Sequence, residues 1–430
     1  MITPFDDPSR LPIRDIMCID CKSFYASTEA IRRAEHPLAA KIAVLSRAES
    51  NGGLILAASP DTKKDYGVKL GTRKFEIKPD MDIQLVSPHM ADYIRLNYRV
   101  NQIFRQFTDD SHWFVYSVDE SFIDVTHSHK LFGSNEEIAA KIQDKVFKET
   151  GIVTTIGIGP NPLMAKLALD NAAKVQAPWR AAWTYEEVPE TIWKIPSLTD
   201  FWSIGAKTAN KLERMGIHSI YDLAHADRKK LNKKFGILGD ALYFHSWGID
   251  YSDLAKRYVP RSDNKGYGNS QVLMRDYVTK EDIETVLFEI ADQVATRLRK
   301  HKVLCEVIGI QVGFAEPNLE GENGWGAQTK VDPTNQTNDL IMATKYLFEK
   351  KWQGEALRSL GVRVNRVSHP NSLQMSLFED VQKYDANLRL EHTIDQIRDR
   401  YGYKAIVRGY SKLSAGTAID RSKLVGGHQA

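Results

Sequence analysis

The sequence has little of several features that would place it in a specialised class of protein. Only three of its 430 residues are cysteine, so no disulfide framework is expected and a reducing compartment is favoured. No uninterrupted apolar run is long enough to span a bilayer, and the first residues, MITPFDDPSRLP, lack the basic start and apolar stretch of a secretory signal. The net charge is only +3, so contact with a polyanion has to come from local clusters such as RKKLNKK at residues 228–234. We therefore expect a cytoplasmic protein of about two to four domains that does not bind a membrane.

Two of the three cysteines form a C-x-x-C pattern, Cys18 and Cys21, which would suit a redox or zinc site. The surrounding segment DIMCID is predicted to be a buried strand, and side chains three apart in a strand point to opposite faces. No second Cys or His pair at ligand spacing accompanies them. A structural role for both thiols is the favoured interpretation.

The first part of the chain predicts an α+β fold. A strand over residues 16–19 leads into a helix that Pro37 stops, and residues 113–125 alternate as two strands joined by a tight turn. The capping box at residues 134–137 opens an amphipathic helix that Gly151 stops, and a further strand follows. This order is that of a ferredoxin-like sheet with helices on one face. A small subdomain is inserted between about residues 37 and 88.

Later segments change in character. After Pro178 come short helices punctuated by glycine, and the Ile204-Gly205 turn resembles a helix–hairpin–helix, whose backbone N–H groups can meet a phosphate. Strand-like and helical runs between residues 259 and 364 indicate a further α+β domain. Residues 365–380 are interpreted as an exposed linker, and the small, polar residues 411–430 as flexible.

Three acidic residues form the strongest candidate site. Asp20 ends one predicted strand, while Asp119 and Glu120 lie at the turn of a hairpin in the same predicted sheet. Carboxylates held so close would raise one another's pKa unless a cation neutralised them. Oxygen ligands favour Mg²⁺, and two such ions can serve in-line phosphoryl transfer. Each residue taken singly also fits a solvated turn or a helix cap.

The segments IDCKSFYAS and YSVDESFIDV together resemble the paired catalytic motifs of the Y-family DNA polymerases, the translesion enzymes, and most closely their UmuC branch (ImpB/MucB/SamB type). The resemblance extends over residues 14–365. It implies two Mg²⁺ ions bound by Asp20, Asp119 and Glu120, with the main-chain carbonyl of Cys21 as an extra ligand. It also implies an error-prone, template-directed DNA polymerase that acts in SOS-type repair of DNA damage.

The same resemblance assigns the nucleotide pocket. Tyr25 is expected to be the steric gate that excludes a 2′-hydroxyl, and Phe24 to line the pocket beside it. Lys64 and Lys174 are expected to contact the triphosphate; Lys166 lies on a similar helical face to Lys174. This sequence departs from the family pattern because Lys64 stands where Arg is frequent and Asp61 where a tyrosine is common.

The resemblance further implies a right-hand polymerase with a ferredoxin-like palm, small fingers, a helix–hairpin–helix thumb and an α+β little finger. The expected boundaries are 1–36 and 86–185 for the palm, 37–85 for the fingers, 186–255 for the thumb, 256–366 for the little finger and 367–430 for a tail. In the thumb, Gly205, Lys207 and Lys211 are expected to contact DNA phosphates.

Partners follow from the same reasoning: primer-template DNA, deoxynucleoside triphosphates and, from the UmuC likeness, a UmuD-like accessory subunit. Gln374, Leu377 and Phe378 resemble the bacterial sliding-clamp binding peptide. Two alternatives to an active polymerase are a catalytically inactive scaffold that binds DNA and the clamp, and a nucleotidyl cyclase on a similar palm. The intact carboxylates and Tyr25 disfavour the scaffold, and the hairpin and clamp peptide disfavour the cyclase.

Overall fold

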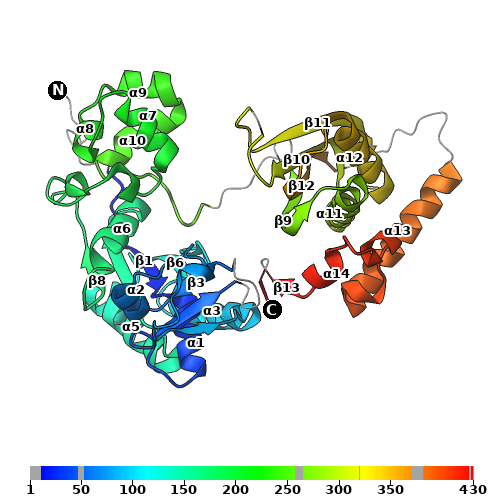
Figure 1. Cartoon of the computed structure of the whole chain (residues 1–430). Coiled ribbons are helices and arrows are strands. Elements are labelled where there is room, and N and C mark those ends of the chain that lie inside the picture. Colours follow the sequence, from blue (N-terminus) through cyan, green and yellow to red (C-terminus); the bar gives the residue numbers. More distant parts are fainter. Residues whose placement is uncertain are drawn as a thin grey trace. The chain divides into compact units, whose positions relative to one another are not determined.

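The computed structural model describes residues 11–46, 53–256, 265–318, 320–369, 381–425 and 428–429 (Figure 1). The chain divides into two compact units, residues 1–257 with 428–430, and residues 258–427.

A five-stranded sheet forms the centre of the first unit, in the order β5-β6-β1-β7-β8. Its strands are β1 (Ile16–Cys21), β5 (Trp113–Val115), β6 (Glu120–Asp124), β7 (Thr154–Gly159) and β8 (Arg180–Ala182). The first strand runs antiparallel to both β6 and β7, and β8 runs parallel to β7. The strands β5, β6, β1 and β7 therefore have the predicted ferredoxin-like arrangement.

Helices α1 (Phe24–Arg32), α3 (Met90–Phe104), α4 (His129–Phe132), α5 (Asn135–Thr150) and α6 (Pro162–Ala168) accompany this sheet. Helix α5 begins with the predicted capping box at Ser134 and ends at Gly151, whose φ of 76° favours glycine. Both boundaries are thus confirmed.

Helix α6 corrects the prediction that helices cover one face alone. It lies against the face that carries Cys18, since Ala165 and Leu169 share an apolar cluster with Cys18. A Cβ on Gly157 would come within 2.1 Å of the Ala165 carbonyl oxygen, so only glycine admits α6 so close. Met17, on the opposite face, is also fully buried, which means that both faces are covered here.

The insertion after α1 folds as the predicted small subdomain. It contains a three-stranded sheet in the order β3-β2-β4, with β2 (Ile42–Leu45), β3 (Ile55–Ala58) and β4 (Gln84–Val86), the helix α2 (Pro60–Tyr66) and a 3-10 helix (Lys74–Glu76). Ala26 and Ala30 of α1 pack against Ile42 and Val44 of β2. Helix α1 therefore connects the subdomain with the larger sheet.

A helical segment completes the first unit. Its helices are α7 (Ala206–Glu213), α8 (Ile220–Ala224), α9 (Arg228–Phe235) and α10 (Ile237–Ser246), preceded by 3-10 helices at Ile192–Lys194 and Leu198–Asp200. Leu163 and Leu167 of α6 belong to the apolar core of this segment. Helix α6 thus packs against the sheet with one side and against the helical segment with the other.

The second unit is an antiparallel sheet in the order β11-β10-β12-β9. Its strands are β9 (Tyr267–Tyr277), β10 (Leu304–Phe314), β11 (Gly324–Thr334) and β12 (Leu357–Ser368), and the helices α11 (Lys280–Lys300) and α12 (Thr337–Lys351) pack on it. Ile310 and Val362 belong to the core beneath these helices. The alternate residues Gln311 and Arg363 are exposed, so they lie on the other face.

The end of the described chain is ordered, so the prediction of a flexible end is wrong for residues 411–425. The elements here are α13 (Val381–Tyr401), 3-10 helices at Tyr403–Ala405 and Gly409–Lys412, α14 (Ala418–Arg421), and the short strands β13 (Leu424–Val425) and β14 (His428–Gln429). Ala415 and Ala418 are buried, and the Tyr277 hydroxyl donates to the Ala415 carbonyl oxygen.

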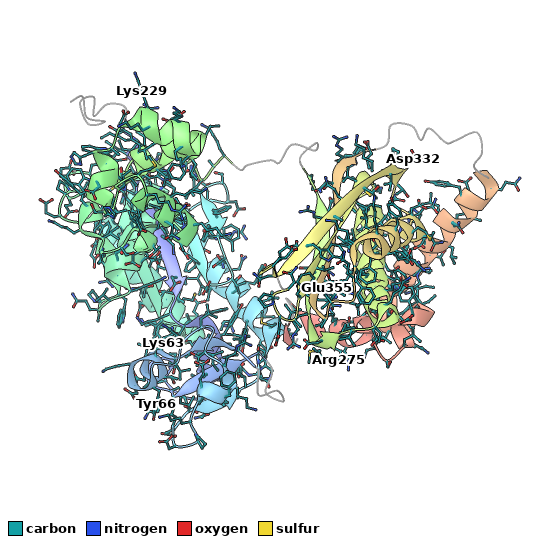
Figure 2. All side chains as sticks on the ribbon, turned by 45° about the horizontal axis from the view of Figure 1, so that its top comes forward. Lys63, Tyr66, Lys229, Arg275, Asp332 and Glu355 are labelled. Atoms are coloured by element: carbon teal, nitrogen blue, oxygen red, sulfur yellow. The ribbon has the colours of Figure 1, made fainter. Side chains whose placement is uncertain are left out.

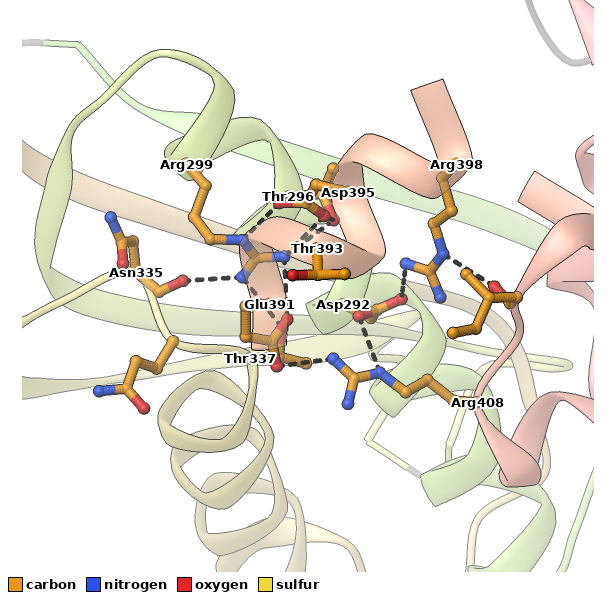
Figure 3. A network of polar contacts seen from close by, with 12 residues as sticks. Asp292, Thr296, Arg299, Asn335, Thr337, Glu391, Thr393, Asp395, Arg398 and Arg408 are labelled. Atoms are coloured by element: carbon orange, nitrogen blue, oxygen red, sulfur yellow. Dashed lines mark hydrogen bonds and ion pairs between the residues drawn. The ribbon is translucent and has the colours of Figure 1, made fainter. Parts of the chain in front are cut away.

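Buried ion pairs join α13 to α11 (Figure 3). Arg299 of α11 contacts Asp395 at 2.6 Å and Glu391 at 3.1 Å, and Arg398 of α13 contacts Asp292 of α11 at 2.8 Å. Arg408 bridges Glu391 and Asp292 from the far side. Because these charges are buried, each depends on its partners, and α13 is part of the second unit's core.

Among the described helices, none combines the length and the apolar character needed to cross a membrane.

Candidate active site

The three predicted carboxylates are neighbours in the five-stranded sheet. Asp20 of β1 is the direct antiparallel partner of Glu120, the first residue of β6. The Cys21 N–H donates to the Asp119 carbonyl oxygen at 2.8 Å, which fixes the hairpin tip against the end of β1. The Ser117 hydroxyl donates to Asp119 Oδ1 at 2.6 Å. Two segments far apart in sequence thus bring their acidic side chains to one end of the sheet.

The environment of Asp20 makes a negative charge there costly. Burial, together with the nearby Asp119 and Glu120, raises its pKa to about 6, although the Lys174 ammonium opposes the rise. A carboxyl group with a raised pKa among other acids calls for a cation. The site therefore needs neighbouring positive charge.

Two lysines partly meet this demand. Lys166 Nζ lies 2.8 Å from Glu120 Oε1, and Lys174 Nζ lies 3.2 Å from Asp20 Oδ2. Asp170 sits between them and contacts both ammonium groups, at 3.0 and 2.9 Å. Despite burial, the carboxylates raise the pKa of both lysines, so both stay charged. A short π-helical turn (Leu169–Ala173) continues α6 and carries the chain from Lys166 to Lys174.

The sequence assigned no role to Lys166, yet its side chain is almost fully buried against Glu120. The available signal was its spacing, since Lys166, Asp170 and Lys174 recur every four residues on one helical face.

The cysteines have structural roles. Cys18 and Cys21 are both free and buried. The Cys18 thiol donates to Glu120 Oε1 at 3.0 Å, and burial together with Glu120 raises its pKa. A thiol held protonated in this way is a weak metal ligand.

The two predicted pocket aromatics begin helix α1. Phe24 is buried, whereas Tyr25 is half-buried and stacks on Tyr93 of α3, with ring centroids 4.5 Å apart and planes 16° from parallel. Burial and the nearby Asp119 raise the pKa of Tyr25, so the ring lies within electrostatic reach of the carboxylates.

Helix α2 carries two adjacent lysines, Lys63 and Lys64, and both are exposed. Lys63, labelled in Figure 2, lies on α2, and its Nζ donates to the Ser23 hydroxyl at 2.9 Å. Lys64, which the sequence named as the triphosphate contact, has an exposed side chain. The role of Lys64 stays a prediction, as does the consequence of Asp61.

The remaining predicted residues lie elsewhere. Gly205 precedes α7 as its N-cap, and Lys207 and Lys211 are exposed one turn apart on that helix. Gln374, Leu377 and Phe378 lie outside the described residues.

Comparisons with known proteins identify the family of this chain. Residues 19–170 match the impB/mucB/samB family, residues 264–377 match the C-terminal domain of that family, and residues 199–250 match the thumb domain of DNA polymerase-iota. UvrX of Bacillus subtilis (strain 168), named for UV-damage repair, is 38% identical over 99% of this chain and 100% of its own length. DNA polymerase IV 2 of the same organism is 34% identical over 96% of this chain and 98% of its own length.

This chain belongs to the Y-family DNA polymerases. A solved Y-family DNA polymerase chimera of Dbh and Dpo4 shares the fold, with a TM-score of 0.64 at 18% identity over 82% of this chain and 99% of that one. The predicted family and fold class are therefore confirmed.

In this Y-family polymerase, the acidic site fits a divalent cation in its donor chemistry. Carboxylate oxygens suit Mg²⁺, and Asp20, whose pKa is raised by burial and by the neighbouring Asp119 and Glu120, lies beside two further carboxylates. Within the described part of the chain, no three His, Cys, Asp or Glu side chains already form a metal cage. Lys166 and Lys174 instead pair with two of the carboxylates. A bound ion would therefore have to compete with at least one of these ammonium groups.

Proposed function

We propose that this polymerase is an error-prone, template-directed enzyme that performs translesion DNA synthesis in SOS-type damage tolerance, by nucleotidyl transfer at a two-Mg²⁺ site. The observation that supports the proposal best is the pairing of Asp20 with Glu120 beside Asp119. The similarity to UvrX, whose name refers to UV-damage repair, supports the repair role.

The chemistry assigned to each group follows from its place. Asp20, Asp119 and Glu120, with the Cys21 carbonyl, would hold two Mg²⁺ ions, which when bound activate an attacking hydroxyl and stabilise a leaving oxygen. Lys174 pairs with Asp20. If a bound cation neutralised the Asp20 carboxylate, the Lys174 ammonium could bind a triphosphate oxygen instead. Lys63 and Lys64 are the candidate triphosphate contacts from α2.

The half-buried ring of Tyr25 is assigned as the steric gate, and the buried Phe24 as part of the pocket wall. A ring under the incoming sugar leaves no room for a 2′-hydroxyl, so deoxynucleotides are favoured. Deoxynucleoside triphosphates are accordingly the proposed substrates.

We assign residues 1–36 and 86–185 to the palm, 37–85 to the fingers, 186–255 to the thumb and 256–366 to the little finger. Residues 381–425, which the sequence places in the tail, are grouped with the little finger because α13 packs on α11.

Primer-template DNA is the proposed ligand of the thumb, at Gly205, Lys207 and Lys211. It is also the proposed ligand of the open sheet face that carries Arg363. On that face a hollow of about 330 Å³ is lined by small and polar residues such as Ser270 and Gly361. Because the proposed substrate is cellular DNA, we propose that the enzyme acts in the cytoplasm.

Lesion bypass is tested by primer extension on two templates that differ only in one abasic site. The small inserted sheet leaves little protein to sense a distorted base pair, so we expect full-length product from both templates, with slower passage at the lesion. Gel analysis of timed reactions measures this passage. Passage of the lesion by the chain alone would show that no UmuD-like subunit is required. Complete extension of the undamaged template with a permanent stop before the abasic site would contradict translesion synthesis by the chain itself.

Binding to the sliding clamp is proposed through Gln374, Leu377 and Phe378. Two large apolar side chains in a polar sequence favour a partner that covers them. We expect the double variant Leu377→Ala, Phe378→Ala to lose stimulation by the clamp and to keep its clamp-independent rate. Processivity on circular primed DNA, measured with and without the clamp, tests this assignment. Equal stimulation of the wild type and the double variant by the clamp would refute it.

A further inference from the structure

Tyr93 lies directly against the ring assigned as the steric gate. It is fully buried on α3, and its ring stacks on Tyr25 nearly in parallel at 4.5 Å. The other aromatic contact of Tyr25 in the described part of the chain is a tilted one with the adjacent Phe24, at 5.9 Å. Tyr93 also meets Phe24 edge-on at 6.4 Å. One buried ring thus supports both pocket aromatics.

Tyr93 is itself fixed by a buried carboxylate. Its hydroxyl donates to Glu29 Oε1 at 2.8 Å, and Glu29 on α1 is fully buried. Glu29 also contacts Arg33 at 2.7 Å and His89 at 2.8 Å. A buried carboxylate with these three partners resists any movement that would leave it unpaired.

The protonation states of Tyr93 and Glu29 preserve the hydrogen bond between them. Burial and Glu29 raise the pKa of Tyr93, so its hydroxyl stays a donor. Burial alone would raise the pKa of Glu29, but the hydrogen bonds from Arg33, His89 and Tyr93 outweigh it and lower that pKa. The hydroxyl and the carboxylate therefore remain donor and acceptor at neutral pH.

We propose that Tyr93, anchored by Glu29, is a positioning residue that determines how strictly the polymerase excludes ribonucleotides. A steric gate discriminates only if its ring cannot yield to the 2′-hydroxyl. Tyr25 is half-buried, and its broad stacking contact is the one with Tyr93. Removing Tyr93 opens a space into which Tyr25 can turn. The inference rests on the proposed function, because it takes Tyr25 as the gate.

The test measures kcat/KM for one deoxynucleotide and for its ribonucleotide on the same primer-template. In Tyr93→Leu we expect the ratio of the two values to fall by about two- to tenfold, the range that corresponds to losing one aromatic pair. Tyr93→Phe keeps the stack and loses the bond to Glu29, so a smaller fall is expected. The matched control is Tyr98→Leu, on the same helix and 64% exposed, which should leave the ratio unchanged.

Two further variants separate this inference from the proposed function. If Tyr25→Ala leaves the ratio unchanged, the gate assignment itself fails. If Tyr25→Ala lowers the ratio and Tyr93→Leu does not, Tyr93 has no positioning role. In the double variant, the ratio should be no lower than in Tyr25→Ala alone, because Tyr93 acts through Tyr25. Should Tyr93→Leu fail to fold, Tyr93→Phe decides: an unchanged ratio overturns the inference and a lowered one supports it.

Discussion

Replacing Asp119 with asparagine is expected to lower the rate of nucleotide incorporation by about 10³-fold or more, a loss of about 4 kcal/mol in transition-state stabilisation. Asparagine keeps the size of the side chain and can still accept a hydrogen bond from Ser117, so the hairpin should stay folded. What it removes is a negative charge at the proposed metal site. Single-turnover incorporation with Mg²⁺ measures the loss.

A surface acid provides the control for this prediction. Asp144 on α5 pairs with Lys148 in solvent, and Asp144→Asn should incorporate nucleotides at the normal rate. If Asp119→Asn retains more than about a tenth of that rate, the chemistry does not depend on this carboxylate and the site has been assigned wrongly.

Replacing Arg299 with methionine is expected to lower the free energy of unfolding of the second unit by about 3–5 kcal/mol. The guanidinium is 1% exposed and pairs with Asp395 and Glu391 of α13. It also donates to the Asn335 carbonyl oxygen at 3.0 Å. Methionine fills much of the volume but leaves Asp395 without its cation and Glu391 with Arg408 alone. We therefore expect α13 to separate from α11 before the rest of the unit unfolds.

Hydrogen exchange of the full chain, followed on peptides from α13, measures this separation. The control is Arg358→Met, which breaks an exposed pair with Asp276 on the same sheet and should cost less than about 1 kcal/mol. Unchanged protection of α13 in Arg299→Met would mean that apolar contacts, rather than the ion pairs, hold the helix.

Local signals predicted much of the first unit. The capping box at Ser134, the stop at Gly151 and the alternation on either side of Asp119 each depend on neighbours in sequence, and each appears in the structure. The pairing of Asp20 with Glu120 could not be predicted from local signals, because it depends on which strands pair and in which register. There the family resemblance supplied what periodicity alone could not.

Long-range contacts between charged residues escaped prediction. Lys166 and Arg299 look like solvated residues on helices, yet partners from distant segments bury both. Helix α13 has a polar sequence because its buried side forms ion pairs where an ordinary core helix has apolar contacts, so hydrophobic periodicity gives no sign of it. The stack of Tyr93 on Tyr25 also escaped prediction, because it depends on how α3 meets α1.

The most direct test of the central claim is a crystal structure with primer-template, incoming deoxynucleotide and Mn²⁺, whose anomalous scattering locates the ions. We predict two ions bound by Asp20, Asp119 and Glu120, with Lys174 turned from Asp20 to the triphosphate. The account would be contradicted if the nucleotide were bound in the active site but the ions lay elsewhere, with Lys166 and Lys174 still paired with the carboxylates.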